Sequence, residues 1–201
     1  MTVLVATEDE ISESVAIRLI GQTAANMSDL QLVRKNGNGY LRSRIGTFMS
    51  VAKRRPVLML TDLDQTKCAP TLIRKWTKGK ALPTRFLFRV AVREVESWLL
   101  ADREGIAKYL SIAPQKITSA PEEIADPKAY LLDLARGAPR ELRNELLPAK
   151  GSIASQGFGY NSRLREFVAK DWSPKRAAER CESLRRALDR VSGLCNAPGG
   201  T

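Results

Sequence analysis

A short apolar run that ends in two carboxylates constrains the fold of this chain more than any other stretch. Residues 57–60 read Val-Leu-Met-Leu, follow Pro56, and are followed closely by Asp62 and Asp64. A continuous apolar run of this length is typical of a strand buried on both faces, as in a parallel sheet. Residues two apart in an extended chain point the same way, so both Asp side chains are expected to project together.

Two interpretations of this Asp pair are open at this point. Two neighbouring carboxylates repel each other unless a cation or hydrogen-bond donors offset the repulsion, and carboxylate oxygens are the ligands that Mg²⁺ and Mn²⁺ prefer. The pair could therefore be a metal site. It could equally be a solvated turn in which an Asp caps a helix that begins near Pro70.

Acidic residues follow two other apolar runs in the same way. In an alternating strand–helix order, right-handed crossovers produce an open parallel sheet in which the carboxyl ends of the strands meet at one edge. The three acidic pairs would then share one cation site. They are Glu8 and Glu10 after residues 3–6, Asp62 and Asp64 after residues 57–60, and Glu94 and Glu96 after residues 86–92.

Helical periodicity fills the intervals between these strands and the whole C-terminal half. The first helix is expected to begin near residue 9, where Thr7 and Glu10 could form a capping box. Further helices are expected over residues 40–53, 70–79, 127–135, 139–147, 160–170 and 174–191. A strand is expected at 30–33, and loops at 36–39 and 151–159. Trp98 is expected to lie in the core. The sequence thus predicts an α/β domain over residues 1–102, an all-helical subdomain over 103–195 and a frayed tail over 196–201.

The basic residues are concentrated around the Asp pair. Residues 31–93 hold fifteen Lys and Arg against Asp62 and Asp64, a net charge of +13, whereas the remainder of the chain has a net charge of −2. A basic surface around an acidic spot is what a polyanion approaching a metal site requires, although solvated helix faces are the alternative. The residues expected to contact a nucleic-acid backbone are Arg42, Arg44, Arg74, Lys75, Lys78 and Arg93.

The composition excludes several kinds of chemistry and location. The chain has no histidine, which excludes Ser-His-Asp catalysis and His-ligated zinc. Cys68, Cys181 and Cys195 show no paired spacing, which argues against a zinc site and for a reducing compartment, so we expect a cytoplasmic protein. No apolar run approaches the roughly 20 residues of a membrane span, and the N-terminus lacks the basic region of a signal peptide.

With these clusters in view, the chain resembles Toprim-domain proteins, and most of all a Toprim-like bacterial family of unknown function related to the OLD-type nucleases. The resemblance rests on residues 5–10 (Val-Ala-Thr-Glu-Asp-Glu), on residues 62–64 (Asp-Leu-Asp) and on residues 93–102, with weaker likeness at 126–128 and 159–161. It implies a Toprim-like, Rossmann-like parallel sheet with helices on both faces. It also implies a nuclease activity, a role in phage defence and a neighbouring ATPase as partner.

The sequence departs from the Toprim pattern at one position. The Glu of the usual Val-Glu-Gly motif is replaced by Ala6, and the next acid of the motif falls on Glu10. Glu8 could reach the vacant place, because it lies two residues further on the same side of an extended segment. If it does not, the site holds one metal or none.

The first functional hypothesis is a Mg²⁺- or Mn²⁺-dependent nuclease acting on DNA or RNA. Its catalytic residues would be Glu8, Glu10, Asp62, Asp64, Glu96 and Lys128, and its metal ligands Glu10, Asp62, Asp64, Glu94 and Glu96. The alternative is a non-catalytic Toprim-like nucleic-acid-binding or ATPase-associated subunit. A small-molecule phosphatase or nucleotide enzyme is a third interpretation, and the oligomeric state, monomer or homodimer, stays open.

Overall fold

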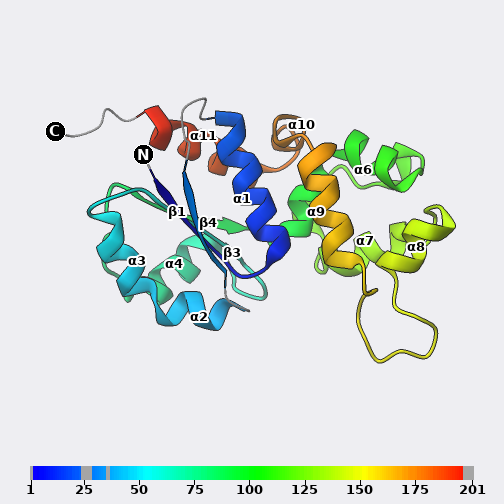
Figure 1. Ribbon diagram of the computed structural model, residues 1–201, viewed down its shortest axis with the longest axis horizontal. Helices are drawn as coiled ribbons and strands as arrows, with labels where there is room; N and C mark the ends of the chain where they lie inside the picture. The colour runs from blue at the N-terminus through cyan, green and yellow to red at the C-terminus, as the bar shows by residue number, and fades with distance from the viewer. Residues whose placement is uncertain (1, 24–28, 35–36, 197–201) are drawn as a thin grey trace.

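The computed structural model describes residues 2–23, 29–34 and 37–196, and a four-stranded parallel sheet lies at the centre of this part of the chain (Figure 1). The strand order is β2-β1-β3-β4. The strands are β1 (Val3–Thr7), β2 (Leu30–Arg34), β3 (Val57–Asp62) and β4 (Phe86–Ala91). The α/β class and the parallel sheet expected from the sequence are confirmed.

Helices cover both faces of the sheet, because alternate strand residues are apolar on both sides. Val3 and Val5 of β1 belong to a core shared with α1 (Glu10–Thr23). Leu4 and Ala6 belong to a second core on the opposite face. That second core is closed by α2 (Asn38–Ser43), α3 (Ile45–Ala52) and α4 (Ala69–Thr77). Figure 1 shows these three helices on one side of the sheet and α1 on the other.

Beyond β4 the described chain is helical. The helices are α5 (Val95–Ala101), α6 (Arg103–Leu110), α7 (Pro127–Ala135), α8 (Arg140–Leu146), α9 (Tyr160–Lys170), α10 (Pro174–Ala178) and α11 (Glu182–Asn196), with short 3₁₀ turns at Pro114–Lys116 and Pro121–Glu123. They extend the α1 side of the core without a break. The domain boundary at residue 102 stays a prediction.

Trp98 joins the sheet to the C-terminal helices. Its side chain is 0% exposed, which confirms the expected core position. Its indole N–H donates to the Ser183 hydroxyl at 2.7 Å, and its carbonyl accepts from the indole N–H of Trp172 at 3.1 Å. These hydrogen bonds satisfy polar groups that would otherwise be costly to bury.

Asp102 forms a second connection between the two halves. Its carboxylate is fully buried and accepts from the Ser173 amide at 2.7 Å and from the Gly105 amide at 3.2 Å. The Arg176 guanidinium donates to both of its oxygens, at 2.7 and 2.8 Å. A buried carboxylate with this many donors is a charge whose desolvation is offset by hydrogen bonds.

Three helix expectations need correction. The helix expected over 40–53 is interrupted at Arg44, where φ is −104° and ψ is 8°. The helix expected over 174–191 is two helices, because the Glu122 carboxylate caps a new start by accepting from the Glu182 and Ser183 amides at 2.9 and 3.0 Å. At α1 the cap is Asp9, which accepts from the Ser12 amide at 2.8 Å, instead of a Thr7 capping box. Helix α6 had no counterpart among the expected elements.

Some expectations fall partly outside the described residues. They concern the beginning of the loop at 36–39 and most of the tail at 196–201. Among the helices that the structure describes, none combines the length and apolar character that crossing a membrane requires.

Candidate acidic site at the carboxyl edge of the sheet

The acidic clusters lie where the parallel strands end. From β1 the chain passes to β2 on one side, whereas β3 pairs with β1 on the other, so the β1–β3 border is the point where the strand order reverses. Ligands of open α/β sheets bind at such a point. Glu8 bridges this border by accepting hydrogen bonds from the Thr61 hydroxyl and, at 3.2 Å, from the Asp62 amide.

Hydrogen bonds also connect the end of β3 with α5, and α5 with α9. Asp62 accepts from the Val95 amide at 2.9 Å, at the start of α5. Glu96 is only 6% exposed and accepts from the Tyr160 hydroxyl at 2.9 Å. Each carboxylate is thus held in place by a donor from a different element, which fixes its position at the edge.

Glu94 and Lys128 extend this arrangement toward α7. Glu94 accepts from the backbone amide of Lys128 at 3.0 Å. The Lys128 ammonium lies 5.1 Å from the centre of the Tyr160 ring, within the range of a cation–π interaction. The structure therefore brings Lys128, expected from the sequence, close to the acidic cluster.

The pKa values show that these carboxyl groups share one electrostatic environment. Burial, followed by the charges of Glu96 and Glu8, raises the pKa of Asp62 well above its usual value. Burial, followed by the charge of Glu94, raises the pKa of Glu96 to about 7. Burial is also the main cause of the raised pKa values of Glu8 and Glu94. Such a cluster is stabilised by protons or by a bound cation.

Asp64 and Glu10 are placed differently from the sequence expectation. Asp64 has a φ of 49°, so it lies in a turn and not in the extended segment that the sequence predicted, and its projection beside Asp62 stays a prediction. Its amide donates to the Arg93 carbonyl at 2.9 Å, and Arg93 donates from its guanidinium to the Asp64 carbonyl at 3.0 Å. The charge of Asp64 nevertheless contributes to the raised pKa of Asp62.

Glu10 forms ion pairs at the start of α1. Its carboxylate lies 2.9 Å from the guanidinium of Arg34, at the end of β2, and 3.3 Å from that of Arg165 on α9. The neighbouring residue Asp9 is closer to the acidic cluster in its effect, because its charge contributes to the raised pKa values of Glu8, Asp62 and Glu96. The role of Glu10 as a metal ligand stays a prediction.

Sequence reasoning missed two participants in the cluster. Asp9 was visible only as one acid within an acidic run. Tyr160, which holds Glu96, was noticed only within the Gly-Tyr-Asn segment of the family resemblance. It lies 64 residues from Glu96 in the chain, so no local spacing could have connected them.

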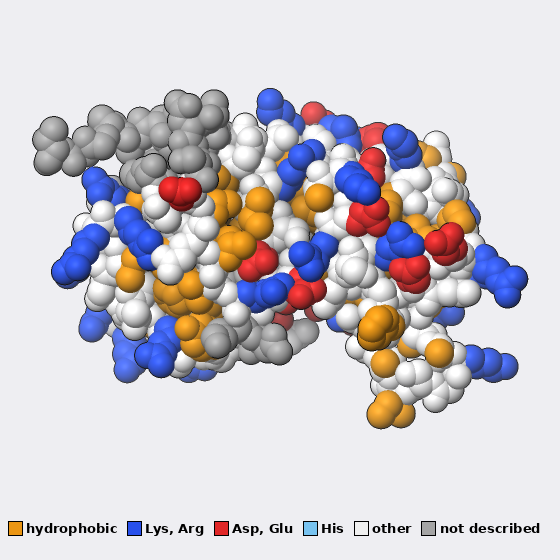
Figure 2. All heavy atoms as spheres, in the orientation of Figure 1, with side chains coloured by type: hydrophobic (Ala, Val, Ile, Leu, Met, Phe, Trp, Pro, Cys, Tyr) orange, Lys and Arg blue, Asp and Glu red, His pale blue; other side chains and the backbone are white. Residues whose placement is uncertain are grey.

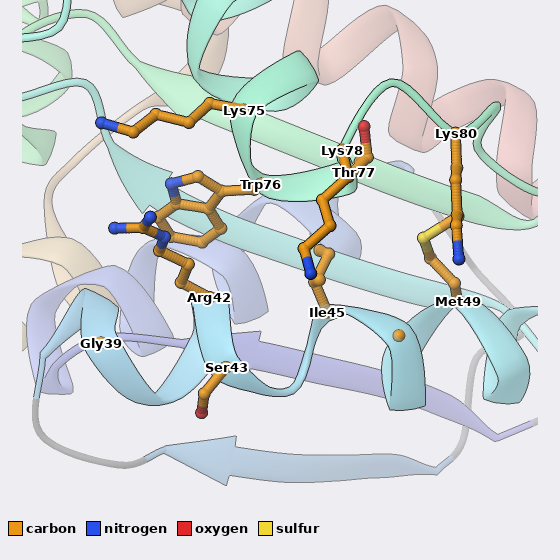
Figure 3. A pocket seen from close by; sticks show the side chains of 11 residues that line it. Gly39, Arg42, Ser43, Ile45, Met49, Lys75, Trp76, Thr77, Lys78 and Lys80 are labelled. Carbon is orange, nitrogen blue, oxygen red and sulfur yellow. The ribbon is translucent and has the colours of Figure 1, made fainter.

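The expected nucleic-acid contacts divide into separate groups. Arg42, Lys75 and Lys78 line one hollow between α2–α3 and α4, together with Lys80, which sequence reasoning did not select (Figure 3). Arg93 lies beside Asp64 at the acidic edge. Arg44 and Arg74 are exposed and do not line that hollow. Figure 2 shows Lys and Arg side chains along the margin of the α2–α3 side, with few acidic side chains among them.

The donor chemistry of the edge suits a hard divalent cation. Four carboxylates at this edge each accept a hydrogen bond from another part of the protein, and these are Glu8, Asp62, Glu94 and Glu96. Among the described residues, however, no three acidic or cysteine side chains stand close enough together to hold a metal ion. The oxygens needed for a metal are present, and their side chains would have to rotate to converge on it.

No protein-family model, curated protein or solved structure matches this chain. The fold alone does not define the function, because a parallel α/β sheet supports many unrelated activities.

The pH dependence of stability offers a test of the acidic cluster. The Glu96 pKa of about 7 lies above its value of 4.5 without burial, so the folded protein binds the proton more tightly than the unfolded chain. Stability should therefore fall as pH rises from 4.5 to 7, by about 3 kcal/mol from this group. In urea denaturation with EDTA, Glu96→Gln should flatten this fall. An equally steep fall in the variant would show that Glu96 does not titrate in this range.

Proposed function

We propose that this chain is a Toprim-like, metal-dependent nuclease that hydrolyses phosphodiester bonds of DNA or RNA. The observation that carries the proposal is the bridge from Glu8 to Thr61 and Asp62, which gathers carboxylates at the reversal point of a parallel sheet. The basic excess of residues 31–93 supports a polyanionic substrate. A cytoplasmic location, a role in phage defence and a partner ATPase belong to the same proposal.

Asp62 and Asp64 would hold Mg²⁺ or Mn²⁺, with Glu94 and Glu96 completing the site and Glu10 as a further candidate ligand. A divalent cation held there would supply an activated water at neutral pH and would stabilise negative charge on the leaving oxygen. The protein supplies the orientation. The Val95 amide fixes Asp62, and the Tyr160 hydroxyl fixes Glu96.

Proton transfer and charge stabilisation fall to neighbouring side chains. The raised pKa of Glu8 brings it nearer to the working pH, which suits a general base that takes a proton from water. Arg93 and Lys128 flank the cluster and would neutralise charge that develops on the phosphate. Each of these groups is held by the fold before substrate arrives.

The direct test is to incubate the purified protein with plasmid DNA and with structured RNA in Mg²⁺, Mn²⁺ or EDTA. We expect cleavage that needs the metal, together with a rise in melting temperature on metal addition, because a ligand that binds only the folded state stabilises it. Absence of both effects at millimolar metal would overturn the proposal.

A non-catalytic nucleic-acid-binding or ATPase-associated subunit is the second candidate. Two observations favour it: Ala6, at the usual Toprim Glu position, is fully buried, and the described carboxylates form no ready-made metal group. This candidate predicts nucleic-acid binding that is the same in Mg²⁺ and in EDTA, without cleavage. A melting temperature that does not respond to metal would favour it over the nuclease.

A further inference from the structure

We infer that the hollow between α2–α3 and α4 is a phosphate site that holds the sugar–phosphate backbone of a polynucleotide, and that it does so without a metal ion at the acidic edge. We name it the basic hollow and define it by Arg42, Lys75, Lys78 and Lys80. The inference rests on the proposed function only in taking a nucleic acid as the ligand. It specifies where that ligand is held and which part of it is recognised.

The basic hollow is a real concavity and not a row of surface lysines. Its volume is about 550 Å³, and its floor includes Ile45, Met49 and Trp76. Figure 3 shows Arg42 and Lys75 at the end near Trp76, and Lys78 and Lys80 reaching toward α3. Arg42 comes from α2, Lys75 from α4, and Lys78 and Lys80 from the segment directly after α4, so a ligand in the hollow would be contacted from both sides.

Within the part of the chain that the structure describes, the positive charges of the basic hollow have no acidic partner. Among the described residues that line it there is no Asp or Glu. Within the described ranges none of the four cations belongs to an ion pair, whereas Arg163, Arg176 and Arg180 in the C-terminal half are all paired. The carbonyl end of α4 offsets only a small part of this charge. Four cations that face one hollow without counter-charges are stabilised by a polyanion.

The chemistry of the lining favours the phosphates of a nucleic acid over its bases. Its charged groups are donors only, and Arg42 provides a planar guanidinium that can bind phosphate in a bidentate way. Trp76 is only 8% exposed, so it has no open face on which a base could stack. The basic hollow should therefore bind the backbone without reading sequence.

The basic hollow adjoins the acidic edge through α2. The amide of Gly37, which precedes α2, donates to the carbonyl of Glu8 at 3.3 Å. Arg42 lies within the same short helix. A polynucleotide backbone held by Arg42 would continue along α2 toward the segment that carries Glu8, whereas a mononucleotide has no such continuation. This continuity favours a polynucleotide over a nucleotide or inorganic phosphate as the occupant.

The test is a binding titration in EDTA, where no cleavage can occur, with a fluorescent 20-base-pair duplex of arbitrary sequence. The variant is Lys75→Glu/Lys78→Glu, and both residues are exposed. We expect at least a tenfold loss of affinity and a salt-dependence slope that is smaller by about 2, because two phosphate contacts are lost. The matched control is Lys116→Glu/Lys150→Glu, which makes the same charge change at exposed positions of the C-terminal half.

Three results would overturn the inference. The first is unchanged binding by the Lys75/Lys78 variant, and the second is an equal loss in the control, which would indicate net charge alone. The third is competition by ATP or inorganic triphosphate as strong as that by unlabelled duplex, which would identify a free-nucleotide site. Melting temperatures within a few degrees of the parent establish that the variants are folded. Lys75→Ala/Lys78→Ala is a milder variant, for which we expect a smaller loss of affinity. Because the assay contains no metal, failure of the nuclease proposal leaves its result intact.

Discussion

Replacing Asp62 by Asn is expected to reduce metal-dependent cleavage by at least about 100-fold, the usual cost of removing one transition-state charge contact. Asn has nearly the same shape and can still accept the hydrogen bond from the Val95 amide. The substitution also removes one of the mutually repelling charges around Glu8 and Glu96. Catalysis and metal response should therefore be lost while the fold becomes more stable in EDTA.

Cleavage rates and melting temperatures, each with Mg²⁺ and with EDTA, measure both parts of this prediction. Asp133→Asn is the matched control, because Asp133 is an exposed residue on α7 whose ion pair is with the neighbouring Arg136. It should change neither quantity. An Asp62→Asn protein that cleaves at the parent rate would show that the carboxylate edge is not the catalytic site.

Trp98→Ala is expected to have the largest effect on stability, a loss of about 3–5 kcal/mol. The substitution leaves a cavity between the sheet and the C-terminal helices, because Trp98 is fully buried, and it removes the shorter of two hydrogen bonds donated to the Ser183 hydroxyl, the other coming from the Val92 amide. A loss of this size is a large part of the total stability of a typical domain. Urea denaturation, or the yield of folded protein if the variant does not accumulate, measures it.

Phe158→Ala makes a matched comparison, since Phe158 is a large apolar residue that is fully exposed. Its removal should change the free energy of unfolding by less than about 0.5 kcal/mol. Equal losses in the two variants would mean that Trp98 is not part of the core that the structure shows.

The parallel sheet and the edge where the acids gather could be predicted from the sequence, because both depend on local signals. Apolar runs of four to six residues mark buried strands, and acids directly after them must lie at the carboxyl ends. The run at 57–60 followed by Asp62 is the clearest case, and the structure extends that strand to Asp62 itself. The bridge from Glu8 to Asp62 follows from parallel pairing of β1 and β3.

The features that could not be predicted depend on partners that are distant in sequence or on single backbone angles. Glu122 starts α11 from 60 residues away, and Tyr160 fixes Glu96 from 64 residues away. The left-handed turn at Asp64 breaks the two-residue alternation on which its expected direction was based. The basic hollow likewise needed the fold, because only the packing of the helices places Lys80 in the lining of the same hollow as Arg42 and Lys75.

The buried Asp102 has a consequence for how such a chain can change over evolutionary time. It lies where the strands give way to helices, yet its carboxylate is bonded to Gly105, Ser173 and Arg176. If gene recombination replaced the helical half, the Asp102 charge would be left without partners in an apolar interior, and the free energy of folding would become less favourable by several kcal/mol. The two halves should therefore be inherited as one unit, and diversification is left to exposed positions such as those around the α8–α9 loop.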